Sequence, residues 1–442
     1  MSTFTISRKT FHRNMVIVIL IGSVFVDLLN GFLNDYKSIS FPVGVIFRTF
    51  ITFYLIPYLI RYSKSKIFKL YIFITILWWF LIQFFWLNNN GYSLGREITQ
   101  FSKIIYPSLL CIYFLVCISK QYIVFNDLIR WGTINVLVAS LFILFSAYSG
   151  IGLSTYGNGS TSYGFGTTSF FKAQNDTSLS VLMGFCLSLY IFFGQNQKYS
   201  FIKSTLILFG LIFIGTRAGI MGGFLAVVLF VFQMLFFAAV KNMNGLIKKF
   251  GYFLLVLIGL ITASYITYIK IKDKPYMVNR YIEILTNPPR AQLEDAAYQY
   301  IDKRGIASDL FGAGVGEYRT KLFGNLENKK AAVDADEGKD AEKDYVDLIG
   351  AYGYLFGNWV FLLPLISAFI AFRKYVKRPS NYLHFAMLIA LLIFIGHSII
   401  AGHGIKNPAV GTLLSILYVY VLLPFDPDSI LRTKQSSSHS NI

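Results

Sequence analysis

The sequence predicts an all-α, polytopic membrane protein with one integral membrane domain over residues 1–442, and two observations lead to this prediction. The chain is 55% hydrophobic and only 14% charged, whereas about 25% of the residues of a typical soluble domain are charged. Apolar runs of about 20 residues, the length that crosses a bilayer as a helix, recur along the whole chain.

Taken in order, the apolar runs predict about twelve spans. The first run follows RKTFHR and has no small-residue cleavage site behind it, so we expect it to stay in the membrane as a signal anchor. The spans are expected near residues 15–32, 41–60, 68–87, 102–119, 131–149, 174–194, 201–216, 218–240, 250–269, 345–372, 382–400 and 408–424.

Basic residues predict the orientation of these spans. The chain has a net charge of +18, and most of its Lys and Arg fall on alternate short loops, as is typical of cytoplasmic loops. The charge therefore serves orientation and does not indicate a nucleic-acid partner. Both termini are expected in the cytoplasm, with a tail at residues 425–442. The basic clusters begin at Arg8, Arg61, Lys120, Lys198, Lys241 and Arg373.

The loops on the opposite, outer side are poor in Lys and Arg, apart from one long segment at residues 270–347 between the ninth and tenth spans. Translocation of so long a segment depends little on its charge. Within it, Pro288-Pro289 starts a predicted helix that Gly305 ends, and a glycine-rich turn follows at residues 312–316. We therefore expect one large periplasmic loop that contains short helices.

Arg217 interrupts an uncharged stretch long enough for two spans, so it lies at a hairpin tip or inside the bilayer. A guanidinium there costs several kcal/mol unless it has a partner. Nearby glycines allow close approach, and the start of the second helix adds unpaired N–H groups, so the pattern predicts an anion-binding site. The alternative is that Arg217 reaches the headgroup phosphates. The glycines are Gly215, Gly219, Gly222 and Gly223.

Four further arginines lie on the same side: Arg280, Arg290, Arg304 and Arg319. The planar guanidinium suits phosphate oxygens, so several of them converging on one cavity would suit a lipid pyrophosphate. Arg290 opens a helix, where the helix dipole disfavours a cation and a compensating anion is expected. For Arg319 we expect a solvated surface position.

Candidate bases lie where the long loop re-enters the membrane. Glu342 and Asp344, with Asp347 beside them, could accept a proton from an attacking sugar hydroxyl. The alternative is that they stabilise the dipole of the next helix. His403, between Gly402 and Gly404, could act as a base or as a hydrogen-bond donor, or it could be structural.

Polar residues at the start of the sixth span predict a water-filled cavity shared with Arg217, because they would be costly facing lipid. Lys172 and Asn175 are the principal candidates, with Gln174 and Asp176 beside them. Arg48, inside the second span, belongs to the same cavity by the same argument, and Asp27 is a further candidate. The three cysteines lie in apolar runs and the histidines are scattered, so no metal or disulfide site is expected.

Three segments resemble the O-antigen polymerase and ligase superfamily of bacterial inner-membrane glycosyltransferases. They are the GTRAG hairpin, the stretch from Arg290 to LFGAGVGEY, and EKDYVDLIGAYGYLFG. In ligase-like members the loop ends in a histidine-containing motif before an Asn/Asp-Tyr pair. This chain has Glu342-Lys343-Asp344-Tyr345 there and no histidine in the loop, which favours a Wzy-type O-antigen polymerase.

The resemblance implies a multi-pass protein of the bacterial inner membrane that polymerises undecaprenyl-pyrophosphate-linked glycan repeat units on the periplasmic face. It implies no cofactor, metal or nucleotide sugar, and it suggests a chain-length regulator and a flippase as partners beside membrane lipid. On this interpretation Arg217 and Arg290 hold the leaving pyrophosphate, and Arg280 and Arg304 assist.

Two alternatives stay open. An O-antigen ligase, which transfers polymer to lipid A core, uses the same donor chemistry. A flippase for the lipid-linked unit would also have about twelve spans and a basic cavity. The large outer loop with its glycine turn and carboxylates would have no purpose in a flippase.

Overall fold

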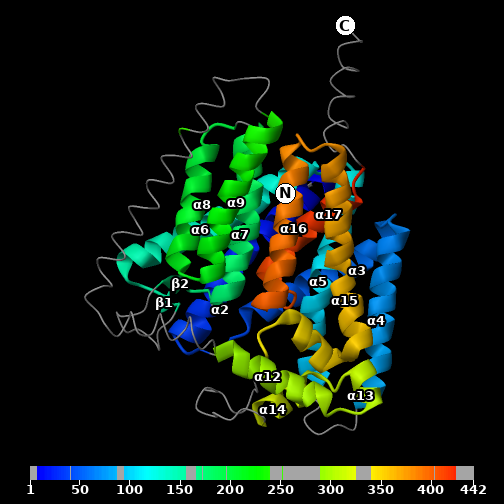
Figure 1. Cartoon of the computed structure of the whole chain (residues 1–442). Helices are drawn as coiled ribbons and strands as arrows, with labels where there is room; N and C mark the ends of the chain where they lie inside the picture. The colour runs from blue at the N-terminus through cyan, green and yellow to red at the C-terminus, as the bar shows by residue number, and fades with distance from the viewer. Residues whose placement is uncertain are drawn as a thin grey trace, which may run out of the picture.

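The structure is a computed structural model, and it describes residues 7–39, 41–86, 94–155, 166–171, 173–195, 197–238, 251, 289–324, 340–402 and 404–424. Long helices run roughly parallel to one another in a single bundle (Figure 1). The first span combines α1 (Arg8–Ile17), a π-helical turn η1 (Val18–Gly22), α2 (Ser23–Gly31) and η2 (Phe32–Tyr36). It is followed by α3 (Val43–Tyr62), α4 (Lys66–Trp86), α5 (Leu94–Ser119) and α6 (Phe125–Ser149).

A short antiparallel hairpin, β1 (Leu153–Ser154) and β2 (Thr167–Ser169), precedes the second half of the bundle. That half begins with α7 (Gln174–Tyr190) and η3 (Ile191–Gln195), α8 (Ser200–Ile214), α9 (Arg217–Gln233) and η4 (Met234–Ala238). Three shorter helices follow, α12 (Pro289–Asp302), α13 (Ile306–Phe311) and α14 (Val315–Gly324). The chain then returns through α15 (Asp344–Lys377), α16 (Tyr382–Ile400) and α17 (Pro408–Leu422).

The prediction of an all-α polytopic membrane protein is confirmed. Within the described residues, nine helices are long and apolar enough to cross a membrane, and α8 and α17 are shorter apolar helices. Each of these helices matches a predicted span. The span expected near residues 250–269 lies outside the described residues except for Gly251, as do parts of the predicted loop and the predicted tail.

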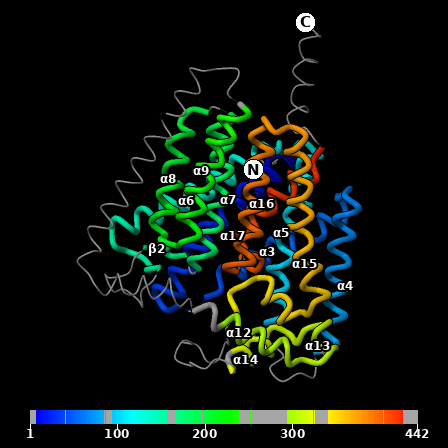
Figure 2. Tube along the Cα trace, viewed as in Figure 1, coloured from blue at the N-terminus to red at the C-terminus, as the bar shows by residue number. Residues whose placement is uncertain are grey.

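Helix α7 lies inside the bundle, between α8 and α9 on one side and α16 and α17 on the other (Figure 2). In its most apolar window 89% of the residues are buried, against 22% for α3. Small residues allow this close packing: a Cβ on Gly184 of α7 would lie 2.3 Å from Val136 of α6. Helix α7 is therefore enclosed by other helices along most of its length.

Helices α12, α13 and α14 form a layer across one end of the bundle (Figure 1), and they dock on a break in α15. Gly353 has φ 73° and ψ 173°, so the hydrogen-bond ladder stops there and leaves carbonyl groups unpaired. Ala351 O accepts hydrogen bonds from the N–H groups of Ala313 (3.2 Å) and Gly314 (2.9 Å). The glycine-rich turn thus substitutes for the missing helical turn.

We expect Gly353→Ala to destabilise the docked layer by about 1–3 kcal/mol, because this backbone conformation is essentially restricted to glycine. A Cβ there would also lie 2.4 Å from the Leu310 carbonyl oxygen. The measurement is the rate of limited proteolysis of the outer helices in detergent. Gly396→Ala in α16 is the control, since a Cβ there meets no atom within 4 Å. Equal proteolysis of the two variants would contradict the docking role.

Candidate functional site

A cavity of about 340 Å³ lies at the end of the bundle covered by α14, and its volume is within the usual range for small-molecule sites, about 300–1,000 Å³. Its walls come from the first span, α3, α5, α6, α7, α14 and the turn before α17. The charged lining residues are Asp27, Arg48, Lys103, Asp176, Arg319, Asp340 and Lys406, and the amides are Asn30, Gln100, Asn135 and Asn407. Four basic residues against three carboxylates leave the cavity with a net positive charge.

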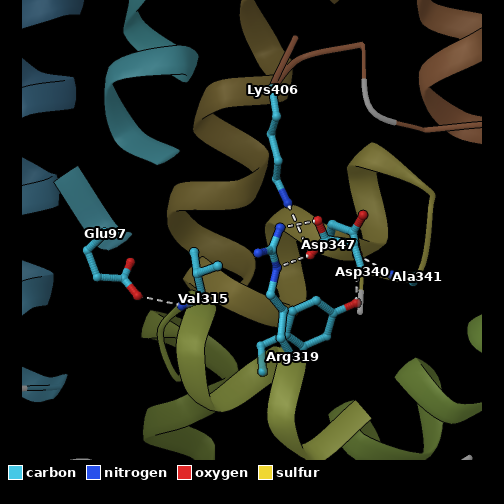
Figure 3. Close-up of polar contacts among 8 residues, drawn as sticks. Glu97, Val315, Arg319, Asp340, Ala341, Asp347 and Lys406 are labelled. Atoms are coloured by element: carbon cyan, nitrogen blue, oxygen red, sulfur yellow. Dashed lines mark hydrogen bonds and ion pairs between the residues drawn. The ribbon is translucent and has the colours of Figure 1, made fainter. Parts of the chain in front are cut away.

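The best-defined contact in the cavity is a shared carboxylate. Arg319 and Lys406 approach Asp340 from different elements (Figure 3). Arg319 donates from Nε to Asp340 Oδ1 (2.8 Å) and from Nη2 to Oδ2 (2.6 Å), a bidentate pair. Lys406 Nζ lies 3.9 Å from Oδ1 of the same carboxylate. The Asp340 carboxylate therefore neutralises the positive charge of Arg319 well and that of Lys406 only partly.

Lys406 is a buried cation with little to stabilise it. Its side chain is 6% exposed, and its Nζ forms no hydrogen bond in the part of the chain that the structure describes. Arg48 and Lys103 form neither a hydrogen bond nor an ion pair with any described residue. Buried charges left in this state are costly, so the cavity is suited to an anion with several oxygen atoms.

Glu97 places α14 over the cavity. This carboxylate, in the first turn of α5, is fully buried, and its Oε1 accepts a hydrogen bond from Val315 N at 2.7 Å (Figure 3). Val315 begins α14, where a negative charge stabilises the unpaired N–H groups and the helix dipole. Arg319 follows one turn later on the same helix face. Glu97 was missed in the sequence, although a glutamate at the start of an apolar span could have indicated it.

Asp347 supports the same arrangement from α15. Its Oδ1 accepts hydrogen bonds from Tyr318 Oη (2.9 Å) and Ala341 N (2.7 Å), which fix the segment carrying Asp340 against α14 (Figure 3). Burial, reinforced by Asp347 and Asp340, raises the pKa of the Tyr318 hydroxyl well above its ordinary value. Burial alone would lower the pKa of Arg319, but its hydrogen bonds to Asp340 outweigh burial and raise that pKa, so Arg319 stays charged.

Two of the residues expected to act as bases, Glu342 and Asp344, do not line the cavity. Asp344 is fully buried, and its Oδ2 accepts a hydrogen bond from Ile405 N at 3.1 Å, which supports the turn carrying Lys406. Glu342 is half-buried and has φ 61°, with its backbone packed against Gly402. His403 lies outside the described residues. The two carboxylates thus have structural positions next to the site.

Arg217 is the first residue of α9 and does not line the cavity. The hairpin tip is held by Thr216, whose hydroxyl donates to Ser178 Oγ of α7 at 2.6 Å. Ser178 does not line the cavity, whereas Thr177 and Val181 of the same helix do. Arg217 Nη2 is buried and forms no hydrogen bond with a described residue.

Arg304 binds the break in α15. Its side chain is 3% exposed, and its Nη1 donates to the carbonyl groups of Ile349 (3.1 Å) and Gly350 (2.9 Å). Its guanidinium also lies over the ring of Tyr300. Arg290 is in the first turn of α12, but its side chain lies outside the described part of the chain, and Arg280 lies outside it altogether.

Of the residues expected to line a cavity, Arg48 does so. Asn175 is half-buried and does not line it, whereas its neighbour Asp176 does, and Lys172 lies outside the described residues. The expectation of a solvated Arg319 is wrong, because the docked layer turns it inward onto Asp340. Lys103 and Lys406 were missed. Lys103 lies near the start of a predicted apolar span, so it could have been identified as a cavity residue by the argument that identified Arg48.

These features define a class: a multi-pass membrane protein whose bundle carries a basic, polar cavity beneath a layer of loop helices. The sequence model of a family described as O-antigen ligase like membrane protein matches residues 9–299, more than half of the chain, and the chain belongs to this family. The family lies in the O-antigen ligase and polymerase group of membrane glycosyltransferase-like enzymes, which confirms the superfamily suggested by the sequence and indicates a role in polysaccharide assembly. No curated protein matches the chain.

Replacing Glu97 tests the placement of α14. Glu97→Ala is expected to lower the free energy of unfolding by about 0.5–2 kcal/mol, the usual effect of losing a helix cap. Glu97→Gln keeps an acceptor oxygen for Val315 N and is expected to cost less. Thermal unfolding in detergent, followed by tryptophan fluorescence, provides the comparison, since Trp86 contacts Gly312 just before α14. An alanine variant as stable as wild type would show that the contact does not stabilise the fold.

Proposed function

We propose that this protein is a polysaccharide polymerase that joins undecaprenyl-pyrophosphate-linked repeat units on the periplasmic face of the bacterial inner membrane. The observation that carries the proposal is the basic cavity at the end of the bundle covered by the loop helices. Family membership supports lipid-linked glycans as substrates. The proposed orientation has both termini in the cytoplasm, as the distribution of Lys and Arg favours.

The cavity chemistry fits the departure of a diphosphate. When the glycan leaves its lipid carrier, negative charge develops on the diphosphate oxygen that had held the sugar. Lys406, Lys103 and Arg48 are cations without a full partner in the described structure, so they are available to stabilise that charge. In this proposal fixed positive charge performs the role of a protonating acid, and the reaction needs neither a metal nor a nucleotide sugar.

We propose that the principal pyrophosphate contacts are the cations of the cavity and not the loop arginines. Arg304 already donates to carbonyl groups of α15, which leaves it a positioning role. Arg217, with a buried Nη2 that bonds to no described residue, stays a proposed contact for the lipid-linked substrate outside the cavity. Arg280 and Arg290 stay proposals of the same kind.

A ligase is the second candidate, and the family's own description favours it. The polymerase is preferred because the loop before α15 has Glu342-Lys343-Asp344-Tyr345 where ligase-like members have a histidine-containing motif. A polymerase would act after a flippase that delivers the lipid-linked units, and together with a chain-length regulator.

Deleting the gene in its host separates these functions. Loss of the polysaccharide ladder on a gel, with core carrying a single repeat unit still present, is expected for a polymerase because export and ligation continue. Long polymer that accumulates on the lipid carrier would instead identify a ligase. Single units that accumulate on the cytoplasmic side would identify a flippase. An unchanged ladder would contradict all three.

The diphosphate site can be tested by binding. Lys406→Ala is expected to weaken the binding of undecaprenyl diphosphate about 10- to 100-fold, because a charge-assisted hydrogen bond contributes about 1.5–3 kcal/mol. Native mass spectrometry of the purified protein in detergent gives the affinity. Lys321→Ala is the matched control, since Lys321 is exposed on α14 and does not line the cavity. Equal affinities for the two variants would remove Lys406 from the site.

A further inference from the structure

Three carboxylates line the cavity, and two of them already have partners. Asp340 is held by both donor groups of Arg319 and lies near Lys406. Asp176, buried in the first turn of α7, accepts a hydrogen bond from Asn407 Nδ2 at 2.7 Å. Asn407 in turn caps the start of α17 through Ala409 N. Both carboxylates therefore hold elements of the site together.

Asp27 differs from the other two. It lies on α2, within the first span, is half-buried and lines the cavity. Its carboxylate forms no hydrogen bond or ion pair with any residue that the structure describes. An ionisable side chain inside a span is costly and is commonly functional. Among the described residues, no backbone N–H group and no amide is held by the Asp27 carboxylate, which leaves its oxygen atoms available to a substrate.

Asp27 also interacts with one of the cations proposed to face the leaving group. Helix α2 packs against α3, and Arg48 of α3 interacts electrostatically with Asp27. In a transfer reaction the attacking hydroxyl must approach the carbon from which the diphosphate departs. A carboxylate beside a cation of the diphosphate site is therefore near the place where both reacting groups meet.

The wall around Asp27 suits sugar hydroxyl groups. Asn135 of α6 is fixed by hydrogen bonds from its Nδ2 to Ser23 Oγ (3.2 Å) and to the Leu20 carbonyl oxygen, in the π-helical part of the first span. Asn30, one turn beyond Asp27, accepts a hydrogen bond from Gly44 N (3.4 Å). Both amides line the cavity in fixed orientations. Amide and carboxylate groups form good hydrogen bonds with hydroxyl groups. They carry no positive charge, so this wall of the cavity suits a sugar and not a second phosphate.

We propose that Asp27 is the general base of the transfer and that the surrounding amides bind the acceptor sugar. This inference rests on the proposed function. The acceptor hydroxyl oxygen forms a bond to the anomeric carbon of the donor sugar, and its proton passes to a carboxylate oxygen of Asp27. The bond from the anomeric carbon to the diphosphate oxygen breaks, and its electron pair leaves with the diphosphate toward Arg48, Lys103 and Lys406.

The test uses the purified full-length protein in liposomes, supplied with lipid-linked repeat units extracted from a host strain that lacks the gene. Asp27→Asn preserves size and removes the base, so the polymerisation rate is expected to fall at least about 100-fold, the lower end for general base catalysis. Binding of undecaprenyl diphosphate should stay within about twofold of wild type, which also shows that the variant is folded. Asp35→Asn, at the exposed outer end of the same span, is the control and should polymerise normally.

Each outcome decides the assignment. A rate for Asp27→Asn within tenfold of wild type would overturn the role of Asp27 while leaving the proposed function intact. Parallel loss of rate and of diphosphate binding would also overturn it, because Asp27 would then support the fold or the binding site. If the wild-type protein forms no polymer from these units, the proposed function fails, and the base assignment fails with it.

Discussion

The ion pair between Arg319 and Asp340, with Lys406 beside it, is the interaction on which the end of the bundle covered by the loop helices depends. It joins three segments of the chain: α14, the segment that precedes α15 and the turn before α17. A charged side chain in this partly apolar environment needs an oppositely charged partner. Here Asp340 is the partner of both Arg319 and Lys406, which lie in two other segments. Their mutual attraction therefore helps to close the layer of loop helices over the bundle and leaves Lys406 facing the cavity.

Around that pair, buried carboxylates separate into two kinds. Glu97, Asp344 and Asp347 each accept a hydrogen bond from a backbone N–H and thereby position a helix or a turn. Each of these contacts engages one carboxylate oxygen and stabilises the ionised form of the acid, so these residues serve to position the chain. Asp27 has no such contact with a described residue, and for this reason it is assigned the catalytic role. Residue type does not separate Asp27 from the other three residues, since all four are acids. Their hydrogen-bond partners do separate them.

The break in α15 gives Arg304 a structural role, because the donor groups of its guanidinium bind backbone carbonyl groups of that helix. Arg304 satisfies carbonyl groups that the break at Gly353 exposes, and the glycine-rich turn satisfies another. Backbone groups left unpaired near lipid are costly, so their requirement takes priority over a substrate contact. Arg217 likewise belongs to a hairpin tip that is bonded to Ser178 of α7, and neither Arg217 nor Ser178 lines the cavity. Arg304 and Arg217, which the sequence predicted to lie on one side of the membrane, therefore do not line the cavity.

The sequence by itself determined the fold class and nearly all the helices, because apolar length and the positions of Lys and Arg follow directly from the thickness and polarity of a bilayer. It also indicated Arg48 and the first turn of α7, since isolated polar groups within spans must face a polar space. Only the tertiary structure decided which charged residues share the cavity, turning Arg319 inward and committing Asp344 to the chain's own N–H groups. The physical reason is that a membrane constrains each span separately, whereas the direction of a side chain depends on packing and hydrogen bonds between segments distant in sequence.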